Sequence, residues 1–285
     1  MSICSAFPKV QSHEGEVMKV LQISPTFFSQ NSVVGGGERY VYELSRAMSE
    51  VTETAFLSFS RNNPSRNSGA LKEVYVPSLR SPLFYQWLAW ADIIHSYQVR
   101  YYHTDIALLF GKLLRKKVFV TDLGAGQIRC PSHYFPLHKM CDAYLLISEY
   151  SKKFWEDQKN ASIPTHLKII YGGVDCDKFC PAAEPRRPFV LYVGRIVAHK
   201  GIEHLIKAVG TDIVLEIVGN IYDSEYFDYL KKLAGNKKVS FLHGISDQEL
   251  LQKYQTAAVV VQPSVYQLYN GVKTKIPELL GLVTL

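Results

Sequence analysis

The stretch FVLYVGRIVAHKGIEHLIKAV, residues 189–209, decides the fold of this 285-residue chain. It opens with a short apolar run, turns at Gly194 and Arg195, and becomes amphipathic after Lys200 and Gly201. A buried strand that leads directly into a helix is the repeating unit of a parallel sheet covered on both faces. Three more apolar runs of strand length follow, at 213–219, 239–244 and 257–264, with amphipathic stretches between them. Residues 181–285 therefore predict a doubly wound α/β domain.

The first part of the chain shows the same alternation. Strands are expected at 18–24, 54–59, 91–96, 117–122, 143–148 and 167–172, and helices at 38–49, 103–115 and 148–158. The segment CPAAEPRRP, residues 180–188, has three prolines and few apolar residues, which is typical of a linker. We therefore expect a loose polar extension at 1–17, an α/β domain at 18–180 and a second one at 181–285.

The composition fits a globular protein of two domains, because an average domain has roughly 150 residues. Apolar residues make up 47% and charged residues 20%, which excludes disorder as the main state. The net charge of +6 is not concentrated in a basic stripe, so it favours phosphate-bearing ligands or a light contact with an acidic membrane surface over nucleic acid. Five cysteines, no apolar run that could cross a bilayer and no secretory signal predict a cytoplasmic protein, at most peripheral to the inner face of the membrane.

Gly35, Gly36 and Gly37 follow the first expected strand and open the first helix. Glycines let the backbone approach a ligand closely, and a helix N-terminus attracts anions, so a phosphate or sugar site is expected here. A flexible turn is the alternative. The spacing is not G-x-G-x-x-G, and no acidic residue stands suitably about 20 residues further on, which disfavours a dehydrogenase or a nicotinamide-dependent epimerase.

Charged residues stand where open α/β sheets bind ligands, after the carboxyl ends of strands. Arg195 and Lys200 fit a diphosphate, whereas solvated surface charge is the alternative. A helix is expected to begin near Pro277, and Glu278 in its first turn either serves the helix dipole or points into a cleft between the domains. Backbone N–H groups of residues 281–283 would face a phosphate in the same turn.

Other side chains leave alternatives open. His95, near the end of an expected strand, either reaches the cleft or is a satisfied core histidine. The pattern C-x2-H-x4-H-x2-C at 130–141 lacks the spacing of a standard zinc site, and no Asp-x-Asp is present to hold Mg²⁺, so no metal is expected. Aromatic residues at 84–102 stack on sugars, lie against a membrane or, as we favour, pack in the core.

Taken together, these segments resemble the retaining glycosyltransferases of family 4. The stretches that match are GGGERYVYELSRAM (35–48), ADIIHS (91–96), DAYLLISEYSKKF (142–154), YGGVDCDKF (171–179), YVGRIVAHKGIEHLIKAV (192–209), LEIVGN (215–220), SDQELLQKYQTAAVVVQPS (246–264) and PELLGLVTL (277–285). The resemblance implies the GT-B fold, which has two facing Rossmann-like domains. The second domain is expected to be incomplete, because the second glutamate of the last motif would stand at position 286.

The resemblance also implies the residues of the site. Arg195 and Lys200 would hold the donor diphosphate, and Glu278 would lie next to the donor sugar. The donor-side positions implied are Gly194, Gly219, Gly281, Leu282, Val283, Gly36 and Gly37. The family uses a nucleotide-sugar, commonly a UDP- or GDP-sugar, and requires no metal or other cofactor.

One departure from the family concerns TDLGAG (121–126), where the family often has a histidine and this chain has Leu123. Leucine cannot donate a hydrogen bond to a sugar hydroxyl, so Asp122 or His95 would have to act in its place. We predict transfer of a sugar from a nucleotide-sugar to a saccharide, lipid-linked or small-alcohol acceptor with retention of configuration. The alternative is a truncated, catalytically incompetent chain with at most weak nucleotide-sugar or partner binding.

Overall fold

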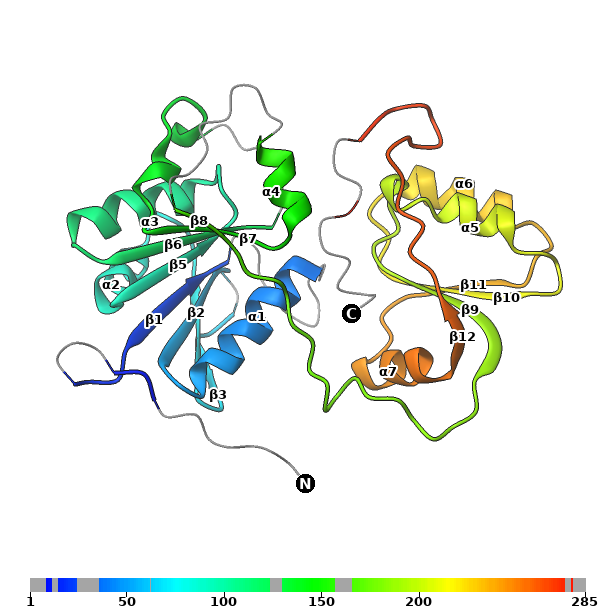
Figure 1. The fold of residues 1–285 in the computed structure, drawn as a ribbon, viewed down its shortest axis with the longest axis horizontal. Coiled ribbons are helices and arrows are strands. Elements are labelled where there is room, and N and C mark those ends of the chain that lie inside the picture. The colour runs from blue at the N-terminus through cyan, green and yellow to red at the C-terminus, as the bar shows by residue number, and fades with distance from the viewer. Residues whose placement is uncertain are drawn as a thin grey trace. The chain divides into compact units, whose positions relative to one another are not determined.

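The structure, a computed structural model, describes residues 9–11, 15–24, 36–61, 63–123, 130–156, 166–274 and 278. The chain divides into two compact units, residues 1–171 and 172–285, and each has its own sheet (Figure 1). The sequence led us to expect the boundary after Cys180, and the structure places it nine residues earlier, after Tyr171. Both units have the α/β architecture that the alternation of strands and helices predicts.

Unit 1 contains an eight-stranded sheet in the order β3-β4-β2-β1-β5-β6-β7-β8, in which only β3 runs antiparallel to its neighbour. Its strands are β1 (Lys19–Ile23), β2 (Glu53–Phe59), β3 (Arg66–Ser68), β4 (Leu71–Val76), β5 (Ile93–Tyr97), β6 (Lys117–Asp122), β7 (Ala143–Leu146) and β8 (Leu167–Ile169). Its helices are α1 (Gly36–Ser49), α2 (Pro82–Trp90), α3 (Tyr102–Leu113) and α4 (Glu149–Glu156), with short 3-10 helices η1 (Pro131–His133) and η2 (Leu137–Met140). The six expected strands are confirmed, while β3, β4 and α2 were not predicted.

Helices cover both faces of this sheet (Figure 1). On one face, buried side chains such as Leu21 and Ile94 pack with α2 and α3 in the larger core. On the other, Phe56 and Tyr97 pack with Val41 of α1. The half-buried aromatic side chains of α2 lie against the larger core, which confirms core packing for residues 84–90.

Unit 2 contains a four-stranded parallel sheet in the order β11-β10-β9-β12. Its elements are β9 (Arg187–Val193), η3 (Ala198–Lys200), α5 (Ile202–Ala208), β10 (Val214–Val218), α6 (Ser224–Ala234), β11 (Val239–Leu242), α7 (Asp247–Thr256) and β12 (Ala257–Val260). Residues of α5 and α6 pack on one face, and residues of α7 on the other (Figure 1). The helix starts follow from local chemistry: Asp223 caps α6, and Ser246 and Glu249 form a capping box at α7.

The described part of the N-terminal extension is hydrogen-bonded, which differs from the expected loose segment. Val10 donates its N–H to the Val51 carbonyl at 2.9 Å, and Met18 donates to the Val10 carbonyl at 3.0 Å. Gln11 and Val17 form an antiparallel bridge. These bonds attach the segment to the residues that flank β1 and β2. No helix among the described residues is long and apolar enough to cross a bilayer.

Candidate functional site

The carboxyl ends of β9 and β10 bring two glycines together. Gly194 donates its N–H to the Val218 carbonyl at 2.9 Å. A Cβ atom on Gly219 would lie 1.8 Å from the Gly194 carbonyl oxygen, so no other residue fits at position 219 without a shift of the backbone. The edge of the sheet is therefore bare backbone at this point, in the region where open α/β sheets bind ligands.

Next to this edge, Lys200 forms an ion pair with Glu278. Gln262, which follows β12, donates a side-chain hydrogen bond to the same carboxylate oxygen of Glu278. The Lys200 side chain is 12% exposed and the Glu278 side chain 32% exposed, so solvent reaches the carboxylate more than the ammonium. The structure thus joins two residues that the sequence placed in separate motifs, and adds Gln262, which the sequence analysis missed.

The backbone around Gly201 fixes this arrangement. Gly201 has φ of +64°, and a Cβ atom there would lie 2.2 Å from the Pro263 carbonyl oxygen. Val265 donates its N–H to the His199 carbonyl at 3.0 Å. The segment after β12 therefore packs against η3, which brings Gln262 close to Lys200.

Arg195 lies on the exposed side of the same region. Its guanidinium stands 5.4 Å from the centre of the Tyr222 ring, in a cation–π contact. Its backbone carbonyl accepts a hydrogen bond from the Tyr192 hydroxyl at 3.0 Å. This side chain is thus available to a ligand, with its position supported by an aromatic ring.

The pKa of His199 responds to the positive charges of the site. Burial, and after it the charges of Lys200 and Arg195, lower its pKa to about 4, against the opposite effect of Glu278. At neutral pH the ring is therefore uncharged, and the site's cations are Arg195 and Lys200. Two cations beside bare backbone, one of them paired with Glu278, are suited to a phosphate-bearing ligand.

In unit 1, the two predicted catalytic residues lie on opposite faces of the sheet. His95 sits in the middle of β5, 6% exposed, and its ring nitrogens bond to the Thr121 hydroxyl at 2.7 Å and the Tyr97 hydroxyl at 3.2 Å. Asp122 ends β6 and accepts a hydrogen bond from Tyr144 at 3.2 Å. Because side chains alternate along a strand, Asp122 points away from the face that Thr121 shares with His95. Burial lowers the pKa of His95 to about 3, so the ring is neutral. The structure does not bring the two together, and their catalytic role stays a prediction.

The glycine-rich turn of unit 1 is described from Gly36 onward. Gly36 is the first residue of α1, and a Cβ atom on Gly37 would lie in ordinary contact with Leu123, at 3.5 Å. Leu123 itself packs against the core beneath α1. Leu123 therefore brings an apolar side chain to the start of α1. The predicted Gly281, Leu282 and Val283, and the helix expected near Pro277, lie outside the described residues.

The cysteine and histidine pattern at 130–141 forms no metal site in the part of the chain that the structure describes, where no three His, Cys, Asp or Glu side chains gather. Cys130 approaches the Ser132 hydroxyl at 3.1 Å, and the Cys141 thiol donates to the His138 carbonyl at 2.8 Å. Both are buried free thiols, and burial raises the pKa of Cys141 to about 11. These contacts are those of structural cysteines.

The fold is that of the GT-B glycosyltransferases, with a cation–carboxylate site at the carboxyl end of the second sheet. The model of the family "Glycosyl transferases group 1" matches residues 177–285 of this chain. This finding confirms the resemblance on which the site prediction rests.

Individual relatives agree with the family. The chain is 30% identical over 116 residues to the sulfoquinovosyl transferase SQD2 of Arabidopsis thaliana, covering 36% of this chain and 22% of the relative. It is 37% identical over 124 residues to an uncharacterized glycosyltransferase of Methanocaldococcus jannaschii, covering 36% of this chain and 32% of the relative. The chain thus matches less than a third of the length of these curated relatives.

Among solved structures, Anabaena HepE in complex with UDP resembles the chain with a TM-score of 0.58. The likeness covers 88% of this chain and 75% of HepE at 16% identity. The glycosyltransferase AviGT4, involved in avilamycin A biosynthesis, gives a TM-score of 0.56 at 17% identity, over 86% of this chain and 70% of its own. At these identities the likeness establishes the fold alone.

Proposed function

We propose that the chain uses the site around Lys200 to bind a nucleotide-sugar and that it serves in glycosyl transfer with retention of configuration. The observation that carries the proposal is the convergence of Lys200, Glu278 and Gln262 beside the bare backbone of Gly194 and Gly219. This convergence lies within the stretch that matches the family. HepE, which shares the fold, is described in complexes with UDP and with UDP-glucose, which supports a UDP-sugar as the donor.

The charges of the site suit departure of a diphosphate. When the bond between the anomeric carbon and the diphosphate oxygen breaks, the electron pair stays on the diphosphate. Arg195 and Lys200 would stabilise that charge, Arg195 through a forked contact and Lys200 as a point charge. The acceptor oxygen forms the new bond to the anomeric carbon, and its proton passes to an oxygen of the departing diphosphate.

Glu278 has two states in this scheme. Without a ligand it neutralises Lys200. A bound diphosphate competes for the same ammonium group, which releases the Glu278 carboxylate toward the donor sugar. The carboxylate then accepts hydrogen bonds from sugar hydroxyls, while the hydrogen bond from Gln262 keeps it in place.

For the acceptor we propose a saccharide, a lipid-linked saccharide or a small alcohol. The start of α1 and the end of β6, where Leu123 meets Gly37, would border it. Leu123 offers the acceptor only apolar contact, and Asp122, 9% exposed, is the nearest carboxylate along the chain.

The test is calorimetric titration with UDP, UDP-glucose and GDP-mannose. Arg195→Ala should weaken nucleotide binding about tenfold or more, and Lys200→Ala roughly two- to thirtyfold, because each removes a charge-assisted contact to the diphosphate. Lys238→Ala removes an exposed cation of the same unit and should leave binding unchanged. Equal affinity of all four proteins, or no binding of any nucleotide, would contradict the proposal. Transfer is then followed as UDP release in the presence of each acceptor class.

A further inference from the structure

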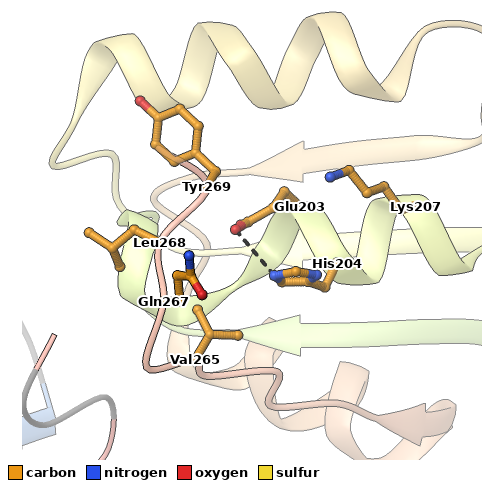
Figure 2. Close-up of a pocket in the computed structure, with 7 residues that line it drawn as sticks. All are labelled: Glu203, His204, Lys207, Val265, Gln267, Leu268 and Tyr269. Atoms are coloured by element: carbon orange, nitrogen blue, oxygen red, sulfur yellow. Dashed lines mark ion pairs between the residues drawn. The ribbon is translucent and has the colours of Figure 1, made fainter. Parts of the chain in front are cut away.

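A pocket of about 410 Å³ opens on unit 2, apart from the group around Lys200 (Figure 2). One wall is α5, and the other is the segment 265–269, which follows β12. None of its lining residues belongs to the group formed by Lys200, Gln262 and Glu278. Its volume falls in the range of about 300–1,000 Å³ that is usual for small-molecule sites.

The pocket contains a buried carboxylate with an unused oxygen. Glu203 of α5 has a side chain only 1% exposed. Its Oε2 accepts a hydrogen bond from the Tyr226 hydroxyl, whereas its Oε1 accepts none from the described residues. The Nε2 atom of His204 stands 3.6 Å from Oε1, which is too far for a hydrogen bond (Figure 2). A buried carboxylate oxygen without a donor is unfavourable, and a ligand that supplied a donor would remove that cost.

The hydroxyl proton of Tyr226 is donated to Oε2 of Glu203, so Oε1 is the carboxylate oxygen without a donor in the described part of the chain. Burial, and next the hydrogen bond to Glu203, raise the pKa of Tyr226. The phenol therefore stays protonated and always donates to Oε2. Oε1 is left for a donor that comes from outside the protein.

The other walls favour a neutral ligand with several hydroxyl groups. The exposed Lys207 and Gln267 add hydrogen-bond donors, and the ammonium of Lys207 disfavours a cationic ligand. Tyr269 adds an aromatic ring, held by stacking on Tyr229 at 4.7 Å and 18°. Val265 adds an apolar contact at the other end of the segment 265–269 (Figure 2). Hydroxyls that both donate and accept, on a ring with an apolar C–H face, match these groups.

We propose that this pocket is an accessory site for a neutral saccharide unit, separate from the nucleotide-sugar site. The inference rests on the proposed function, because an enzyme that extends or glycosylates a saccharide meets such a ligand in its acceptor. Glu203 would accept from a sugar hydroxyl, Lys207 and Gln267 would donate to others, and Tyr269 would contact the ring.

The experiment is saturation-transfer NMR with methyl glycosides of glucose, galactose and mannose on the full chain. At least one glycoside should bind, and Glu203→Gln should weaken it tenfold or more, because an amide nitrogen replaces the free acceptor. Tyr269→Ala changes an exposed side chain and should weaken the same glycoside, which guards against a folding defect in the buried variant. Glu225→Gln, the same change at an exposed position of α6, should have no effect; melting curves confirm that all variants fold.

The two sites are tested separately. Saturating UDP should not displace the glycoside, and Arg195→Ala should leave glycoside binding intact. If UDP fails to bind but the glycoside binds as described, the nucleotide proposal falls and the pocket stands. The pocket proposal is overturned if no glycoside binds, if Glu203→Gln binds as well as the natural chain, if UDP displaces the glycoside, or if butylammonium binds there instead.

Discussion

Opposite substitutions in the Lys200–Glu278 pair should change UDP affinity in opposite directions. The two side chains neutralise each other in the structure, so a diphosphate has to replace Glu278 as the partner of Lys200. Glu278→Gln removes that competitor and one negative charge, while an amide oxygen can still accept from Gln262. Lys200→Ala removes the cation itself.

The magnitudes follow from exposure. The pair is partly solvent-exposed, at 12% and 32%, so its own strength is near the upper value for exposed pairs, about 1 kcal/mol. Glu278→Gln should therefore tighten UDP binding roughly fivefold. Lys200→Ala loses a charge-assisted hydrogen bond of about 1.5–3 kcal/mol, less the competition of about 1 kcal/mol that it also removes, and should weaken UDP binding roughly two- to thirtyfold.

Calorimetric titration of UDP at low and moderate salt measures both changes, with Lys238→Ala and Glu225→Gln as charge-matched controls. The tightening by Glu278→Gln should shrink as salt screens the pair. The same variant should also lose transfer from UDP-glucose, because it lacks the Glu278 carboxylate that would face the sugar. If Glu278→Gln weakens UDP as much as Lys200→Ala does, the idea that the carboxylate competes with the diphosphate is wrong.

Three further predictions concern stability. Gly219→Ala should cost several kcal/mol in urea unfolding, because its Cβ would overlap the Gly194 carbonyl, whereas Gly37→Ala, with its nearest contact at 3.5 Å, should cost less than about 1 kcal/mol; equal losses would show that the backbone shifts freely. The pKa of His95 is lowered to about 3 in the folded chain against about 6.5 unfolded, so the unfolded state binds more protons between these values, and this part of the stability is complete above pH 6.5 and lost as the pH falls toward 3. His95→Gln should thus flatten the fall in melting temperature between pH 6.5 and 4, and an unchanged slope would count against a neutral buried imidazole. Ser246→Ala should cost about 1 kcal/mol in urea unfolding through loss of the α7 cap, and a loss below about 0.3 kcal/mol would mean that water replaces the cap.

Strands and helices could be predicted from the sequence wherever the apolar residues of a segment recur with the period of a strand or a helix. The helix α2 (PLFYQWLAW) could not, because it is apolar around most of its circumference and lacks a helical period. The strand β4 includes Glu73, which is 1% exposed and accepts hydrogen bonds from Tyr42, Tyr75 and Arg66. A buried carboxylate depends on these distant partners, and no local pattern announces them.

In the candidate site too, some residues have a local signal in the sequence and others depend on the folded chain. Lys200 could be found because its place after a strand is itself the signal. Gln262 lies inside the run 257–264 that was expected to be a strand, whereas β12 ends at Val260, so its place after the strand is visible only in the structure. Its convergence with Lys200 on Glu278 depends on the left-handed turn at Gly201 and its contact with Pro263, which only the folded chain supplies.

His95 shows why a position near a strand end does not by itself define a site residue. β5 continues to Tyr97, and the alternation of side chains puts His95 and Tyr97 on the same face of the sheet. On that face α1 covers the sheet. Gln22 accepts a hydrogen bond from the Tyr97 hydroxyl at 2.7 Å, and Tyr97 contacts His95, so the histidine belongs to a buried hydrogen-bond network. Sequence alternation shows which residues share a face, but whether a helix covers that face depends on contacts far along the chain. The same reasoning separates His95, whose nitrogens both have hydrogen-bond partners, from Lys200, whose carboxylate partner a diphosphate would replace in the function that we propose.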